Sequence, residues 1–212
     1  MESMKDSVQK SYKQFLTFYS DFLYGGKSTG LYNKLEIYSA LFDQYNKLDA
    51  GLCSVDPLLD HFLESIEVDL HLSLAKLLEP AKRSDYNIFA FLEFCKNNCK
   101  TISWSSGDMT EGFVQEQLSR LQNWNGTIQK IIGRRDKLFA HLDKKYCLKQ
   151  DSISEEFPLE QSEVIELTNC IIRIIQHHQC RLNGRVNVGS PGHFKTLVEE
   201  MMQKLTAGRG LP

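Results

Sequence analysis

Apolar residues recur at spacings of three and four along most of the chain, which is the period of one face of an α-helix. The clearest run lies within residues 31–48 and comprises Leu31, Leu35, Tyr38, Phe42, Tyr45 and Leu48. No segment shows a convincing strand-type alternation, and no internal repeat is found. The pattern therefore predicts an all-α protein, an up-and-down helical bundle with peripheral short helices.

Turn and cap residues mark where the first helices begin and end. Gly25-Gly26 closes a helix over residues 4–23, and Gly51 closes the helix that follows. Asp56-Pro57 is a strong start signal, with an N-cap aspartate before a proline at the first helical position. That third helix stops at Pro80, because proline cannot continue the hydrogen-bond ladder.

The second half of the chain follows the same pattern. Further helices are expected over residues 88–99, 113–121, 128–146 and 164–181, with an interruption near Trp124-Asn-Gly126. The stretches 101–112 and 151–160 are expected to be loops. We predict a bundle over residues 1–183, a linker over 184–192 and a C-terminal amphipathic helix and tail over 193–212. The apolar stripe of this last helix must dock on the body of the protein or on a partner.

Length and composition fit a cytoplasmic globular protein. The 212 residues are 42% hydrophobic and 25% charged, with five prolines and a net charge of −2, which argues against a dedicated duplex-DNA binder. No apolar run approaches the roughly 20 residues that span a bilayer, and the N-terminus does not resemble a signal peptide. We therefore expect a cytoplasmic protein without membrane contact, whose six cysteines are reduced.

One segment reverses the sign of the charge. Residues 130–149 contain seven Lys/Arg and two Asp, a net charge of +5 in a chain whose total is −2. Such a reversal is a candidate footprint for a phosphate-bearing partner. A solvated helix face with charge pairs between successive turns is the simpler interpretation, and on charge alone it is favoured.

The residue order within this segment is more specific than its charge. Arg135-Asp136-Lys-Leu-Phe-Ala140-His141 resembles the R-[N/D/H]-x-x-x-A-H signature of the HEPN superfamily. Together with the upstream stretch Glu67–Glu79, it resembles the HEPN branch linked to bacterial abortive infection, the Abi U-type group. The resemblance covers roughly residues 30–180, judged by helix order and type. The tyrosine that one HEPN group carries two positions after the histidine is replaced here by Asp143.

The resemblance implies a helical bundle that dimerises and, in active members, a metal-independent endoribonuclease used in phage defence or toxin–antitoxin systems. It assigns catalysis to Arg135, His141 and Asp136. RNA and a second copy of the chain are the expected partners, with an antitoxin or another defence-system protein as a further one. Other members of the superfamily are non-catalytic binding or sensor modules, and this alternative stays open.

The chemistry of these residues suits RNA cleavage without a cofactor. The 2′-OH of RNA can attack the neighbouring phosphate if a base, an acid and a stabiliser of phosphate charge are present. Histidine suits acid–base work because its pKa lies near working pH, and arginine matches phosphate oxygens with a planar fork. One chain supplies a single such histidine, so two copies across a dimer axis would supply both base and acid.

A helical wheel leaves open which arginine accompanies the histidine. At 100° per residue, His141 and Arg134 lie within about 20° of each other, with Lys145 on the same face. Arg135 lies about 120° away, inside the apolar stripe. The candidate substrate-binding residues are Arg134, Lys137, Lys144 and Lys145.

Two arrangements would resolve this geometry. The helix breaks near Gly133, with Asp136 capping a new helix and Arg135 freed to reach the site. Otherwise Arg135 is a core or interface arginine with satisfied partners, and Arg134 binds phosphate.

A metal site is a weaker hypothesis. It would combine Cys95 and Cys99 on one helix with His177, His178 and Cys180 on another. The spacing matches no zinc-binding pattern, and buried free cysteines are common. We therefore expect no metal and no cofactor.

Overall fold

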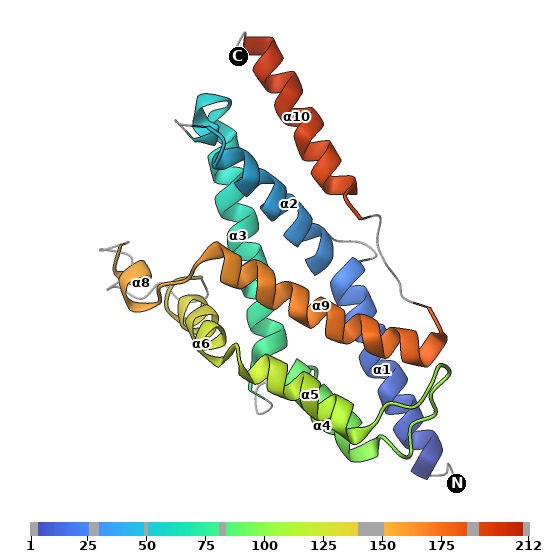
Figure 1. Ribbon diagram of the computed structural model, residues 1–212. Coiled ribbons are helices and arrows are strands. Elements are labelled where there is room, and N and C mark those ends of the chain that lie inside the picture. Colours follow the sequence, from blue (N-terminus) through green and yellow to red (C-terminus); the bar gives the residue numbers. More distant parts are fainter. Residues whose placement is uncertain are drawn as a thin grey trace. The chain divides into compact units, whose positions relative to one another are not determined.

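The computed structural model describes residues 4–25, 30–48, 51–80, 84–139, 151–185 and 191–209 (Figure 1). These residues form helices joined by turns and contain no strand, which confirms the predicted all-α class. Every helix within these ranges is too short or too polar to cross a lipid bilayer. The elements in order are α1 Met4–Tyr24, α2 Leu31–Tyr45, η1 Leu52–Ser54, α3 Pro57–Leu78, α4 Ile88–Asn98, α5 Glu111–Gln122, α6 Asn125–Arg134, η2 Arg135–Phe139, α8 Asp151–Glu156, α9 Gln161–Asn183 and α10 His193–Arg209.

Side-chain caps explain several of these boundaries. The backbone amide of Ala90 donates to Asn87 Oδ1 at 2.8 Å at the start of α4, and the amide of Phe113 donates to Thr110 Oγ1 at 3.2 Å at the start of α5. Glu160 and Glu163 form a reciprocal capping box at the start of α9. Because Thr110 caps α5, the last two residues of the loop predicted over 101–112 belong to the helix.

The prediction of a loop over residues 151–160 is wrong in its first half. Residues 151–156 form α8, which the acidic composition concealed. Ile153 is buried and Phe157 half-buried, and the four-residue spacing places both on one face.

The chain divides into two compact units. One contains Met1–Phe22 and Leu72–Asn187, and the other contains Leu23–His71 and Val188–Pro212. Helices α1 and α3 contribute residues to both units. The predicted arrangement of a bundle over residues 1–183, a linker over 184–192 and a C-terminal helix and tail over 193–212 stays a prediction.

In the second unit, α10 packs along α2 (Figure 1). The buried Val198 and Met202 lie on the apolar stripe of α10. Glu36 on α2 accepts hydrogen bonds from the amides of Gly192 and Phe194 at the start of α10. The docking surface that the stripe requires is therefore provided by α2.

The first unit has an aromatic core. Tyr12 and Tyr19 of α1 are fully buried and pack on Phe91 of α4, with ring centroids 6.1 Å and 5.1 Å away. The Tyr19 hydroxyl donates to the carbonyls of Tyr86 and Asn87 at 3.0 and 3.1 Å. Both tyrosines therefore belong to the core of this unit.

A buried histidine joins the helices of this unit. His178 of α9 places Nδ1 3.1 Å from the Tyr12 hydroxyl and 3.8 Å from the Cys95 sulfur. Its Nε2 lies 3.0 Å from Gln117 Oε1 on α5. Four helices, α1, α4, α5 and α9, thus meet at one imidazole ring. Burial lowers the pKa of His178 to about 3, with a smaller contribution from His177.

We expect this histidine to make the protein sensitive to mild acid. The folded state keeps His178 neutral, whereas the unfolded chain takes up a proton below a pKa of about 6.5. The unfolded state then binds more protons, so stability is complete above pH 6.5 and falls as pH decreases toward the folded pKa. The contribution amounts to about 2 kcal/mol between pH 7 and pH 5, measurable by urea unfolding.

Replacing His178 by Gln should lower stability at pH 7 and flatten this pH dependence. The matched control is His177→Gln, at the exposed neighbouring position, which should keep the full decrease. An unchanged pH dependence in His178→Gln would contradict the assignment.

Candidate functional site

The motif segment continues from α6 without a break at Gly133. Helix α6 runs through Gly133 to Arg134, and Arg135–Phe139 then form the π-helical turn η2. In place of the break expected near Gly133, the helix runs on through this residue and changes to a π-helical turn at Arg135. A π turn is wider than an α turn, so the wheel drawn at 100° per residue does not hold beyond Arg134. Such turns are frequent at functional sites.

Gly133 allows α8 to approach α6 closely. A Cβ atom at Gly133 would lie 2.2 Å from the ring of Phe157, well inside van der Waals contact. Next to it, Arg134 Nε donates to the carbonyl oxygen of Phe157 at 3.0 Å. This glycine thus serves a packing contact.

Arg135 is buried between two carboxylates. Its side chain is 9% exposed, Nη1 donates to Glu79 and Nε donates to Asp136 Oδ1 at 2.8 Å. Within the described ranges, Nη2 is buried without a hydrogen-bond partner. Arg135 therefore matches the second expected arrangement, a satisfied core arginine, except for this one nitrogen.

Glu79 is a site residue that sequence reasoning did not single out. It follows the end of α3 and belongs to the upstream stretch Glu67–Glu79 that carried part of the resemblance. Its partner Arg135 is 56 positions away in the chain. The only signal in the sequence was an acidic residue at the end of an apolar helix, and such a residue is too common to indicate an ion pair. The pair links the two blocks of the resemblance physically.

Much of the positive charge described in this segment is neutralised within the protein. Lys130 lies 3.2 Å from Glu163 of α9, and Arg135 faces two carboxylates. The carboxyl pKa of Glu163 is lowered by the Glu160 backbone amide first and also by Thr127 and Lys130. Lys137 is exposed. Lys130 and Arg135 are therefore paired, but with other helices or an adjacent residue and not through the expected pairs between successive turns of a solvated face.

Three predicted site residues, His141, Lys144 and Lys145, lie outside the described residues. The structure brings together Arg135 and Asp136, and it places Arg134 on the α8 side. The catalytic and substrate-binding roles assigned to all these residues stay predictions.

The cysteine and histidine residues considered for a metal have other contacts. Cys95 and His178 belong to the buried cluster around Tyr12, and His177 packs edge-on against Phe113 at 5.6 Å. In the ranges given above, no three His, Cys, Asp or Glu side chains converge as metal ligands. Burial raises the pKa of the Cys95 thiol well above its usual value, which disfavours the thiolate that a metal requires.

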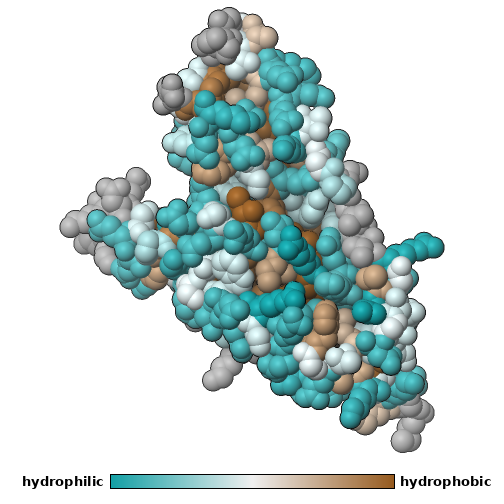
Figure 2. Space-filling model, in the orientation of Figure 1, coloured by the Kyte–Doolittle hydropathy of each residue, from teal (hydrophilic) through white to brown (hydrophobic). Residues whose placement is uncertain are grey.

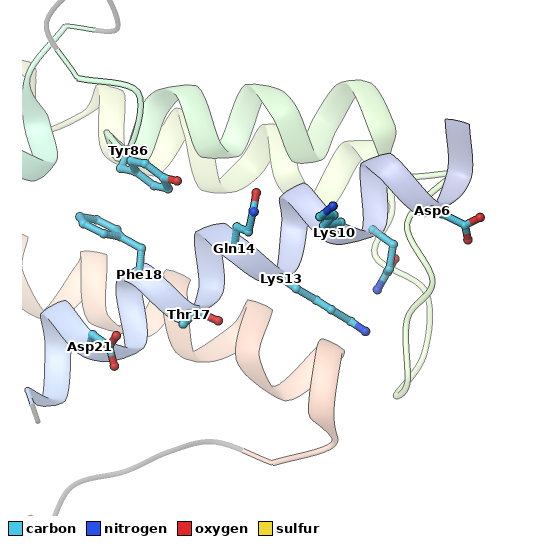
Figure 3. Close-up of a pocket in the computed structure, with 9 residues that line it drawn as sticks. Asp6, Lys10, Lys13, Gln14, Thr17, Phe18, Asp21 and Tyr86 are labelled. Carbon is cyan, nitrogen blue, oxygen red and sulfur yellow. The ribbon is translucent and has the colours of Figure 1, made fainter. Parts of the chain in front are cut away.

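Two hollows on the first unit were not foreseen from the sequence. One, of about 740 Å³, runs along α1 (Figure 3). The rings of Phe18 and Tyr86 lie 4.7 Å apart at one end, and Lys10 and Lys13 lie toward the other. The second lies between α5 and α9 and has a volume of about 590 Å³. Periodicity predicts which residues are buried, but it does not predict hollows between neighbouring helices.

Comparison with known proteins places most of the chain within one family model. The model HEPN_AbiU2, described as AbiU2, matches residues 35–200. No curated protein and no solved structure matches the chain. The match covers more than half of the sequence and includes both Glu79 and the motif.

Substituting Gly133 by Ala should destabilise the protein by about 1–3 kcal/mol, because the added methyl group displaces the Phe157 ring. The control is Gly126→Ala, near the start of the same helix, where a Cβ meets nothing within 4 Å. That variant should be neutral or up to about 1 kcal/mol more stable. Thermal unfolding of the two proteins tests the α6–α8 contact, and equal stabilities would contradict it.

Substituting Arg135 by Ala should cost about 2–3 kcal/mol, since it leaves two partly buried carboxylates without their cation. The matched control is Arg120→Ala on α5, whose pair with Glu116 is exposed and should contribute at most about 0.5 kcal/mol. Urea unfolding measures both. Similar losses in the two variants would show that Arg135 does not anchor the motif helix.

Proposed function

We propose a function for this chain, which belongs to the HEPN AbiU2 family. It is a metal-independent endoribonuclease of a bacterial defence or toxin–antitoxin system. It cuts RNA by 2′-OH attack at a site shared across a homodimer. The observation that carries the proposal is the order Arg135-Asp136-x-x-x-Ala140-His141 within a family-matched region of net positive charge.

His141 is the proposed acid–base group. One copy accepts the proton of the 2′-OH while the copy from the second protomer protonates the leaving 5′ oxygen, so two protomers complete one site. The product is a 2′,3′-cyclic phosphate, because the attacking oxygen stays bonded to phosphorus.

The two arginines then have different tasks. Arg135 forms ion pairs with Glu79 and Asp136. It is therefore suited to fix the beginning of the segment that leads to His141. The proposal therefore treats Arg135 and Asp136 as positioning residues. Arg134, Lys137, Lys144 and Lys145 bind the RNA phosphates, as cations that guide RNA need not be buried.

A non-catalytic RNA-binding or sensor module is the second candidate. The observation that favours it is the burial of Arg135, whose Nη2 lies out of reach of a phosphate in this conformation. In this case the motif stabilises the fold, and the basic segment binds without cutting.

Incubating the purified protein with single-stranded RNA in EDTA separates the two candidates. The endoribonuclease should produce fragments ending in a cyclic phosphate, and His141→Ala should slow cleavage by about 100-fold or more, the contribution of general acid–base catalysis. Excess His141→Ala protein mixed with the wild type should also inhibit cleavage, because mixed dimers lack one histidine.

His61→Ala is the matched control, because this histidine is exposed on α3 and its ring lies 3.6 Å from the exposed carboxylate of Glu64. It should cleave as the wild type does. Undiminished cleavage by His141→Ala would overturn the assignment. RNA binding without cleavage by the wild type, combined with the stability loss of Arg135→Ala, would establish the binding module.

A further inference from the structure

The cleft between α5 and α9 has a composition that the motif does not explain. It measures about 590 Å³ and is lined by Phe113, Gln117, Arg120, Trp124, Arg173 and His177, among others. The two helices are in direct contact and belong to the same unit. In Figure 2 the surface over these helices is largely hydrophilic with apolar patches. Its volume lies within the usual range of small-molecule sites.

A buried hydrogen-bond donor lies at the floor of this cleft. Gln117 is 2% exposed, and among the described residues its amide Nε2 has no hydrogen-bond partner. A buried donor without a partner is unfavourable, so an acceptor brought into the cleft gains affinity by reaching it. Gln117 contributes to the lining of the cleft.

The orientation of that amide follows from the buried histidine. The Tyr12 hydroxyl, which donates to the backbone carbonyl of His178, and the Cys95 thiol both face His178 Nδ1. On the other side of the ring, Gln117 Oε1 lies 3.0 Å from Nε2, so the oxygen of the amide is the end turned toward the histidine. The NH₂ end of the amide is therefore the end without a partner.

Two arginines give the cleft positive charge. The positive charges of Arg120 and Arg173 both reach the Cys170 thiol. Burial raises the pKa of this thiol, and the two charges oppose that rise. Arg120 pairs with Glu116 at 2.6 Å, but both side chains are more than half exposed. Such a pair is weak, so Arg120 can exchange it for an anion. Glu166 also lines the cleft. Arg120, Arg173 and Glu166 together carry a net charge of +1.

Aromatic rings complete the walls. The rings of Phe113 and His177 meet edge-on at 5.6 Å, and Trp124 is half-buried at the junction of α5 and α6. Aromatic side chains beside arginines are the usual means of holding an unpaired base and its phosphate. An inorganic anion would contact only the arginines and would make no use of the aromatic rings or of the Gln117 amide.

We propose that the α5–α9 cleft binds a nucleoside monophosphate unit, either as a free nucleotide or as one residue of single-stranded RNA. Arg120 and Arg173 bind the phosphate, the base lies against Trp124 and the Phe113–His177 pair, and a base carbonyl accepts from the Gln117 amide. Guanine and uracil carry such a carbonyl and adenine does not. The site is separate from the motif, and its existence does not require catalysis.

The test is a titration of the full-length His141→Ala protein, which avoids any cleavage. GMP, UMP, AMP, inorganic phosphate and a short single-stranded oligoribonucleotide are added in separate experiments and followed by calorimetry and tryptophan fluorescence. GMP and UMP should bind more tightly than AMP and inorganic phosphate and should quench Trp124. Binding of the oligoribonucleotide alone would identify the ligand as a residue of RNA.

Arg173→Ala should weaken binding by about tenfold or more, the usual effect of losing a charge-assisted contact to phosphate. Lys100→Ala, an exposed cation at the end of α4, is the matched control and should bind as the parent does. No binding of any nucleotide or RNA, or equal binding by Arg173→Ala and Lys100→Ala, would overturn the proposal. Because the readout is binding in a His141→Ala background, this result is independent of the ribonuclease assay.

Discussion

The fold of the first unit depends on keeping one imidazole ring neutral and fully hydrogen-bonded. His178 receives polar contacts from α1, α4 and α5 while lying on α9, so none of these helices can shift without breaking a buried hydrogen bond. Apolar contacts alone tolerate small slides between helices, whereas a buried polar cluster specifies one register. The surrounding Tyr12 and Phe91 rings exclude the water that would otherwise replace these bonds.

Periodicity was a reliable guide where a helix has one buried face and strong ends. The Asp56-Pro57 signal and Pro80 delimited α3 because capping and proline chemistry act locally. Helix α8 was missed because Ile153 and Phe157 are only two apolar positions in an acidic stretch. The partner of Phe157, the backbone at Gly133, is distant in sequence. Contacts of this kind arise from tertiary packing, which a local pattern does not contain.

In the candidate site, too, the local residue order was predictable from the sequence, whereas the contacts with distant residues were not. The order of residues from Arg135 to His141, taken with the upstream stretch Glu67–Glu79 and the all-helical pattern, was sufficient to predict the family. The surroundings of Arg135 were not predictable, because Glu79 lies 56 positions away and the π turn changes the helical period. The wheel still identified the relevant problem, since a straight α-helix directs Arg135 into the apolar stripe. The protein satisfies that buried cation with two carboxylates, as a buried charge requires.

The neutral histidine also connects the core to the surface. His178 Nε2 lies against Gln117 Oε1, so the amide oxygen faces the ring, and Gln117 also contributes to the lining of the α5–α9 cleft. A proton added to the ring would place a charge where none is stabilised. The low pKa of His178 therefore preserves both the packing of four helices and the polarity of the cleft floor. In this protein one desolvated ring determines a core register and the hydrogen-bonding character of a surface hollow.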